Sequence, residues 1–382
     1  MSIRSGTRTT GRAAFLPTLQ QELLLKACLL DGDEALAAWQ TWRASVKLDH
    51  IDSGSVRLLP LLADKLRRLS VHDAAFDTYR GVQRRSWARN HLLFRATAHI
   101  VRQLEAEGIA VMALKGIVLA SVYYDEMSLR PMNDVDLLIH REDAERAISV
   151  LKQSGSWTRS GGFSPREPAE FAMQPSCAFV FDNNSEIEVD LHWRLFRAYS
   201  SPQADAALWE GARPCEIGEA QCLAPCATDM LLHICAHGLR WNSLPGLRWA
   251  VDATMVMRRA PIDWAYLAEQ ARRRGLSNGL APAFFYLREV LHAPISEGTI
   301  EAFERMRSRP IERLIYQSEL RPPARQTLLM AFLIHCHVAR RELVRFQGLR
   351  GYRRYFHALR RGRSLREIAS WVCRRLAAGF YP

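Results

Sequence analysis

Two aspartates, Asp134 and Asp136, lie two residues apart in an otherwise apolar run that reads DVDLLI. Its valine, leucine and isoleucine content predicts a strand, and the turn-like residues Arg130 to Asn133 come just before it. Side chains of a strand alternate between its faces, so both carboxylates share one face and the apolar side chains take the other. Paired carboxylates repel each other and are costly to bury, so the pattern indicates a Mg²⁺ (or Mn²⁺) site. The simpler alternative is that Asp134 caps the strand and Asp136 forms a surface ion pair.

A second short apolar run, Ala110 to Leu114, ends in Lys115-Gly116 and is followed by helical spacing of apolar residues. The order strand, glycine turn, helix suits a phosphate, because glycine lets the backbone approach closely and a helix start offers N–H donors. Lys115 can meet the phosphate charge, and it is one of few lysines among 52 basic residues. The alternative is that Lys115 only extends its apolar stem along the strand end.

A third acidic residue comes from the segment Cys177 to Trp193, in which Asp182 to Ser185 is turn material between two β-like runs. The segment therefore predicts a hairpin. Alternation in its second strand places Asp190 on a polar face with its neighbours at 188 and 192. Alone, that face is most simply a solvated one, but beside Asp134 and Asp136 it makes Asp190 a candidate third metal ligand.

These motifs together, LKG, YY, RPMNDVDLLI and EVDLHW, resemble the uncharacterised bacterial nucleotidyltransferase family of the DNA polymerase β-like superfamily. The resemblance covers roughly residues 96–240. It implies an α+β fold with a small mixed polymerase-β-like sheet, a nucleoside triphosphate (NTP) as substrate, and Mg²⁺ or Mn²⁺ as cofactor. The residues to which it assigns roles are Asp134, Asp136 and Asp190 for metal binding and catalysis, Gly116 for the triphosphate loop, and Lys115 and Arg130 for the phosphates.

The implied reaction is in-line attack of an acceptor oxygen on the α-phosphorus of the NTP, with pyrophosphate as the leaving group. Asp190 serves either as a metal ligand or as the general base that acts on the acceptor. One position departs from the superfamily, because Ile117 follows Gly116 where a serine or a second glycine is usual. A catalytically inactive, nucleotide-binding relative is therefore an open alternative.

The chain of 382 residues, with 48% hydrophobic residues, is long enough for two or three domains with buried cores. The pattern predicts an N-terminal helical region over 1–95, a nucleotidyltransferase core over 96–200 and a C-terminal helical region over 201–382. The run from Phe76 to Glu107 reads as one long amphipathic helix that feeds the core. We expect the N-terminal region to pack against the nucleotide domain or to form a lid over it.

The C-terminal region is predicted to begin a helix near Thr228-Asp229 that carries His233 and His237 on one face. Their spacing of four suits metal ligands, but no acidic residue lies between them as it does in a zinc protease helix. The resembling family has a similar histidine helix followed by a tryptophan and an aspartate, here Trp249 and Asp252, which implies structural packing against the catalytic sheet. Acceptor binding is the weaker alternative.

Positive charge is concentrated near the end of the chain, where residues 340–375 hold twelve arginines and only two acidic residues, against a net charge of +12 for the whole. Aromatic residues alternate with these arginines, so the tail could bind a polyanion, as in a basic RNA- or membrane-binding adaptor. A solvated helix face is the simpler reading. The cysteines lack the spacing of a zinc ribbon, and no secretory signal or apolar run of membrane-spanning length is present, so we expect reduced thiols and a cytoplasmic location.

Overall fold

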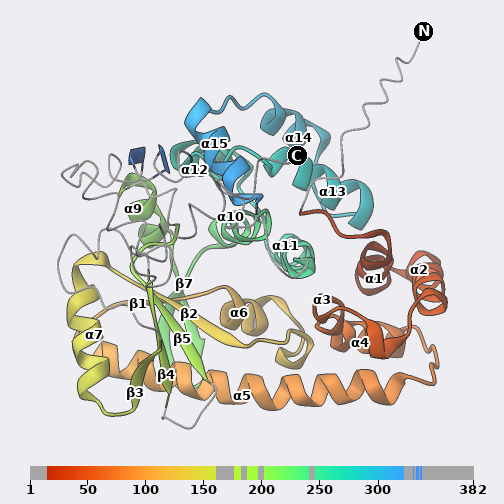
Figure 1. Cartoon of the computed structure of the whole chain (residues 1–382), viewed down its shortest axis with the longest axis horizontal. Helices are drawn as coiled ribbons and strands as arrows, with labels where there is room; N and C mark the ends of the chain where they lie inside the picture. Colours follow the sequence, from red (N-terminus) through yellow and green to blue (C-terminus); the bar gives the residue numbers. More distant parts are fainter. Residues whose placement is uncertain are drawn as a thin grey trace, which may run out of the picture.

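The computed structural model describes residues 15–160, 176–181, 187–196, 202–240, 246–321, 330, 333–334 and 336–337. In these residues the fold is α+β, with one mixed sheet of seven strands flanked by helices from both ends of the chain (Figure 1). The predicted fold class is therefore confirmed.

The chain before the sheet is helical, as predicted. Its helices are α1 (Leu19–Leu29), α2 (Gly32–Ser45), α3 (Ser53–Val56), α4 (Leu59–Arg68) and α5 (Phe76–Ala106). Local sequence fixes where the first one starts, because the Thr18 hydroxyl accepts from the backbone N–H of Gln21 and the Gln21 side chain accepts from that of Thr18.

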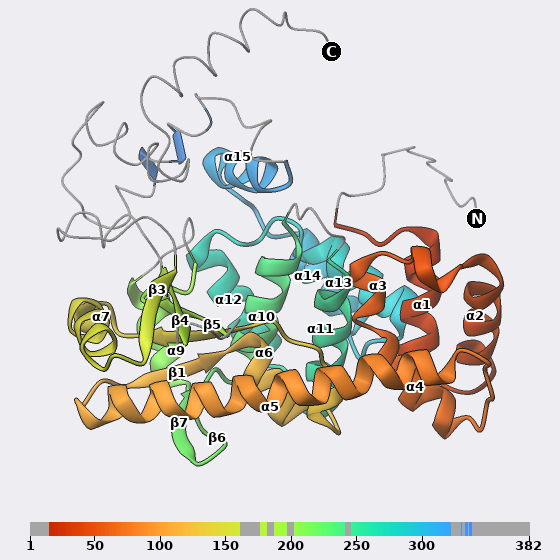
Figure 2. The ribbon, with the colours of Figure 1, turned by 60° about the horizontal axis from the view of Figure 1, so that its bottom comes forward.

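Helix α5 matches the predicted long helix and runs beneath both the N-terminal helices and the sheet (Figures 1 and 2). It continues across residue 95, where the N-terminal region is predicted to end. Its buried Asn90 donates to the backbone carbonyls of Met127 at 2.6 Å and Arg130 at 3.0 Å. Helix α5 thereby holds the loop that leads into the aspartate strand.

The sheet has the strand order β3-β4-β5-β2-β1-β7-β6. Strands β2 and β5 are parallel, as are β1 and β7, and the other neighbours are antiparallel. The strands are β1 (Val111–Leu114), β2 (Asp134–Ile139), β3 (Trp157–Ser160), β4 (Ser176–Phe181), β5 (Glu188–His192), β6 (Arg213–Ile217) and β7 (Ala220–Ala224).

Three sequence predictions about the sheet are confirmed. The apolar run before Lys115 is β1, the run with the two aspartates is β2, and the predicted hairpin is the antiparallel pair β4 and β5. The predicted turn of this hairpin, residues 182–185, lies outside the described residues. In β5 burial alternates, with Val189 and Leu191 buried and their neighbours partly exposed, so the apolar face packs into the core as the pattern predicted.

The other helices carry the chain away from the sheet and back over the site. They are α6 (Lys115–Val118), α7 (Ala144–Gln153), α9 (Pro202–Glu210), α10 (Ala227–Gly238), α11 (Leu247–Arg259), α12 (Trp264–Arg274), α13 (Leu280–Leu291), α14 (Glu297–Glu304) and α15 (Pro310–Glu319). Helices α10 and α11 pack against each other, and they also contact α6 and the π-helical turn that follows it (Figure 1).

Helix α10 begins at Ala227, close to the predicted start near Thr228-Asp229, but its N-cap is Cys226 and neither of those two residues. Asp229 instead lies in the first turn, where its carboxylate accepts from Cys226 Sγ and the Tyr266 hydroxyl. The predicted basic tail, residues 340–375, lies outside the described residues. Among those that are described, no helix is both long and apolar enough to cross a bilayer.

Candidate functional site

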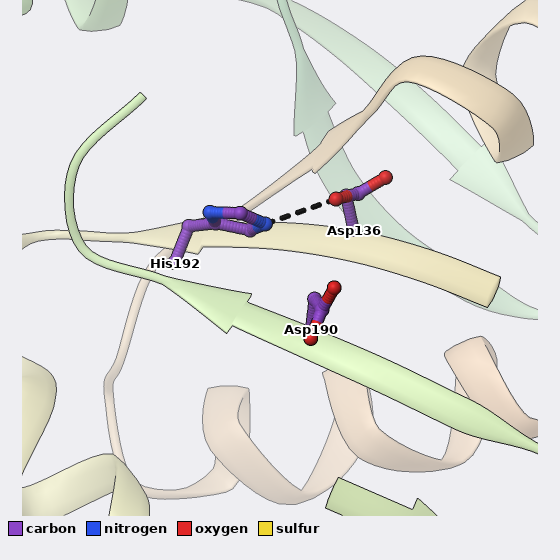
Figure 3. A group of neighbouring side chains, drawn as sticks. All are labelled: Asp136, Asp190 and His192. Carbon is purple, nitrogen blue, oxygen red and sulfur yellow. Dashed lines mark hydrogen bonds and ion pairs between the residues drawn. The ribbon is translucent and has the colours of Figure 1, made fainter. Parts of the chain in front are cut away.

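The acidic residues of the two parallel strands meet at the centre of the sheet. In the register of β2 and β5, Asp136 is the direct partner of Asp190. Figure 3 shows both carboxylates on the same side of the sheet with the imidazole of His192, which also comes from β5. One ligand atom from each of the three lies within 4.8 Å of the others. The structure thus brings together two of the predicted metal ligands and adds a histidine.

Asp136 is the most strongly held of these residues. It is 8% exposed, and its Oδ1 accepts from Lys115 Nζ at 2.8 Å and lies 2.9 Å from His192 Nε2. Burial alone would raise the pKa of Asp136, but the Lys115 charge and the hydrogen bond with His192 hold that pKa well below its usual range. Asp136 is therefore an anion with a fixed orientation at neutral pH.

The pKa of Asp190 is shifted in the opposite direction to that of Asp136. Burial raises its pKa above the usual value, and the nearby charges of Asp136 and Asp134 raise it further, although His192 opposes them. A bound cation would relieve the unfavourable ionisation of Asp190 beside the ionised Asp136. Alternatively, a carboxylate with a raised pKa can act as a proton acceptor. Both readings of Asp190 from the sequence are therefore compatible with its surroundings.

Asp134 lies at the start of β2 and is exposed. In the register Asp134 pairs with Glu188, two positions along the strands from the pair of Asp136 and Asp190. It shares a cleft with Asp136 and the Lys115-Gly116 turn. Asp134 is therefore placed at the rim of the site.

The turn after β1 has a strained backbone at Lys115. Its φ of 41° is in the left-handed region, which residues other than glycine, asparagine and aspartate rarely adopt. This conformation accompanies the ion pair between Lys115 and Asp136. Strain of this kind is concentrated at functional sites, where the surrounding structure maintains it.

Gly116 leaves room for two neighbouring side chains. A Cβ atom at this position would lie 2.9 Å from Arg130 Nη1 and 3.0 Å from Met132 Sδ. The glycine thus allows the Arg130 side chain to cross directly over the turn.

Arg130, which the resemblance assigns to phosphate binding, is 6% exposed and is paired with Asp252 of α11. Its Nε and Nη2 donate to the two carboxylate oxygens at 2.9 and 2.8 Å, and the Tyr124 hydroxyl donates to the same carboxylate at 2.7 Å. Only Nη1 lies beside Gly116. Asp252, predicted to pack against the sheet, therefore joins α11 to the segment that precedes β2.

These residues line a cleft of about 200 Å³ between the sheet and the flanking helices. Lys115, Gly116, Asp134 and Asp136 all border it, together with residues from α10 and α11. It is also lined by two arginines that the sequence analysis did not select, Arg57 after α3 and Arg248 in α11.

The histidines of α10 lie beside this cleft. His237 borders it, whereas His233 is 2% exposed and contacts the Phe196 ring edge-on. The charge of Lys115, followed by burial, holds the pKa of His237 well below its usual range. The burial and ring contact of His233 support the packing role that the sequence favoured for this helix. Among the described residues, the one group suited to a metal is at the sheet.

The donors at the sheet fit a divalent cation. Asp136 and Asp190 offer carboxylate oxygens, which suit Mg²⁺ and Mn²⁺, and the His192 imidazole adds a nitrogen that extends the range to other first-row metals. His192 was not selected from the sequence, although its position two residues after Asp190 on the same strand face was the signal that could have found it.

Comparison with known proteins agrees with this arrangement. The model of a family described as uncharacterised nucleotidyltransferases matches residues 55–292, which is more than half of the chain. The match includes every residue that lines the cleft except Gly54. No curated protein matches the chain. The extent of the family match shows that this chain belongs to the uncharacterised nucleotidyltransferase family.

Proposed function

We propose that the protein is a metal-dependent nucleotidyltransferase of the polymerase β-like type, which moves a nucleoside monophosphate (NMP) from an NTP to an acceptor hydroxyl or phosphate. The observation that carries the proposal is the pairing of Asp136 with Asp190 across parallel strands. Asp136 also borders the cleft that the lysine–glycine turn lines. Family membership supports the same class of reaction.

In this proposal Asp134, Asp136 and Asp190 hold Mg²⁺ or Mn²⁺. When bound, the metal lowers the pKa of the attacking hydroxyl and neutralises charge on the leaving phosphates. His192 and Lys115 fix the orientation of Asp136 through the hydrogen bonds to its Oδ1. Gly116 leaves space over the turn, and Lys115 and Arg130 Nη1 lie close enough to that turn to steady phosphates.

Asp190 can also act on the acceptor directly. Its raised pKa brings it closer to the range in which a carboxylate takes up a proton effectively during catalysis. The proton of the acceptor hydroxyl would then pass to a carboxylate oxygen of Asp190 as the new phosphoester bond forms.

Two radioactive forms of one NTP test this proposal. Label at the α-phosphate should appear on an acceptor, whereas label at the γ-phosphate should appear in pyrophosphate, and Asp136→Asn should abolish both. Asp49→Asn, an exposed aspartate in the N-terminal region, is the matched control and should leave transfer unchanged. Transfer of the γ-label to an acceptor, or equal activity in the Asp136 variant, would contradict the proposal.

A nucleotide-binding protein without transfer activity is the second candidate. Ile117 favours it, because this residue is fully buried and offers no hydroxyl to a triphosphate. This candidate predicts that the protein binds an NTP but transfers neither label. The third possibility, a basic RNA- or membrane-binding adaptor, depends on the tail at residues 340–375, outside the described residues.

A further inference from the structure

Two arginines from opposite ends of the chain reach the same side of the cleft. Arg57 directly follows α3 in the N-terminal region, and Arg248 is in the first turn of α11 in the C-terminal region. Helices α3 and α11 contact each other, and both side chains line the cleft. Both residues are partly exposed and line the cleft, although the charged group of Arg248 is itself largely buried.

The segment before β2 positions both of these side chains. Arg248 Nη1 donates to the Pro131 carbonyl at 3.0 Å. With the Asn133 amide turned so that its oxygen faces Arg57, that oxygen accepts from Arg57 Nη2 at 2.7 Å. Each arginine uses one terminal nitrogen in these bonds, which leaves further N–H donors of the fork for a ligand. The loop therefore fixes the two arginines without neutralising them.

Positive charge in this part of the cleft exceeds the negative charge that is paired with it. Asp252 neutralises Arg130, whereas neither Arg57 nor Arg248 forms an ion pair with any described carboxylate. Burial, with the nearby charges of Arg130 and Arg57, lowers the pKa of Arg248 to about 10. Guanidinium groups that crowd one another in this way indicate that the cleft is suited to an anionic ligand.

We propose that Arg57 and Arg248 bind the β- and γ-phosphates of the NTP and stabilise the charge of the departing pyrophosphate. This inference rests on the proposed function. Planar guanidinium groups can donate two parallel hydrogen bonds to a phosphate. They would also replace the grip that a serine hydroxyl would give at position 117, where this chain has a buried isoleucine. The two helical regions would thus complete the triphosphate site of the sheet.

Calorimetric titrations with inorganic tripolyphosphate, an NTP and the NMP of the same base, all with Mg²⁺, test this assignment. We expect Arg57→Gln and Arg248→Gln each to weaken binding of tripolyphosphate and the NTP by about tenfold to a hundredfold, the usual effect of losing hydrogen bonds to a charged group. Binding of the NMP should change less than about threefold, because that ligand lacks the β- and γ-phosphates. Arg305→Gln, in an exposed pair with Glu301, is the matched control and should match the wild type.

Thermal unfolding of each variant checks that it is folded. Arg248→Lys is a further variant, which keeps the positive charge. The lysine variant should bind the NTP more tightly than the glutamine variant, because the charge remains, but more weakly than the wild type, because the fork is lost. Unchanged NTP affinity in both glutamine variants would overturn the inference and leave the proposed function intact. Equal weakening of NTP and NMP would overturn the β- and γ-phosphate assignment. A wild-type protein that binds no NTP would overturn the proposed function together with this inference.

Discussion

The buried ion pair between Arg130 and Asp252 gives a direct test of how the site is held together. We predict that Asp252→Asn lowers the free energy of unfolding by about 3 kcal/mol. Both side chains of the pair are almost fully buried, at 7% and 6% exposed. Removal of one partner leaves the Arg130 charge buried without compensation, which typically costs about 3–5 kcal/mol. The lower end applies because the asparagine oxygen can still accept one of the three hydrogen bonds that Asp252 receives.

The assay is urea unfolding at pH 7, followed by far-UV circular dichroism. Asp125→Asn is a matched control, because Asp125 also pairs with arginines, Arg68 and Arg259, but is 40% exposed. Exposed pairs contribute about 0–1 kcal/mol, so this variant should remain close to the wild type. The same pair of variants also tests the site, because the loss of Asp252 releases α11, which carries Arg248, from the segment before β2.

A double variant separates the pairing from the packing. Arg130→Met with Asp252→Leu removes both charges, and apolar replacements of buried pairs are often neutral or stabilising. We expect it to be more stable than Asp252→Asn, despite a cost of about 1 kcal/mol at the Tyr124 hydroxyl, which loses its acceptor. A single variant within 1 kcal/mol of the wild type, or a double variant less stable than the single one, would refute this reasoning.

Two further predictions concern the charges at the site. The surroundings of Asp190 raise its pKa, so the ionised carboxylate is unfavourable in the folded protein. The protein is therefore more stable when Asp190 is protonated, and this stability is lost as the pH rises through the folded-state pKa. Asp190→Asn should therefore raise the melting temperature of the metal-free protein at pH 7 and reduce the further rise on addition of Mn²⁺; a lower melting temperature without metal would argue against the raised pKa. Burial, with the charges of Lys115 and His237, holds the pKa of His233 well below its usual range. As the pH falls below about 6.5, His233 takes up a proton in the unfolded chain but not in the folded protein, so the free energy of unfolding decreases. His233→Leu should therefore flatten the loss of stability between pH 7 and pH 5, by a slope of up to about 1.4 kcal/mol per pH unit in urea unfolding, and an unchanged slope would show that His233 is not neutral in the fold.

The strands of the site could be predicted because the alternation of polar and apolar residues within each strand is a local sequence pattern. Alternation placed Asp134 and Asp136 on one face of β2 and Asp190 on the polar face of β5, and the parallel register then made Asp136 and Asp190 neighbours. The same alternation included His192, but its contact with Asp136 depends on how the two strands are aligned, which no local pattern specifies.

The remainder of the cleft could not be predicted from local patterns. Arg57 lies in a short connection more than 70 residues before Asp134, and Arg248 is on an amphipathic helix whose exposed arginines look alike in sequence. Their common position follows from the packing of α3 on α11, which is set by tertiary contacts and not by spacing. The same holds for Arg130, which the family resemblance assigned to the phosphates, whereas its Nε and Nη2 donate to a carboxylate 122 residues away.

The start of α10 shows a smaller limit of sequence reasoning. Threonine and aspartate are strong N-cap residues, which favoured Thr228 or Asp229 over a cysteine. In the structure Asp229 makes two side-chain contacts within the fold, with Cys226 Sγ and the Tyr266 hydroxyl, and the helix starts one residue after Cys226. Tertiary partners thus outweighed the local capping preference.

The central claim is that Asp134, Asp136 and Asp190 form a metal-dependent nucleotide site. Its most direct test is a calorimetric titration of the protein with each NTP, with and without Mg²⁺ or Mn²⁺, repeated on the Asp134→Asn/Asp136→Asn double variant. We predict binding of at least one NTP that requires the metal and is lost in the double variant, while thermal unfolding shows that the variant is folded. Binding that is independent of metal, or that persists in the double variant, would contradict the account.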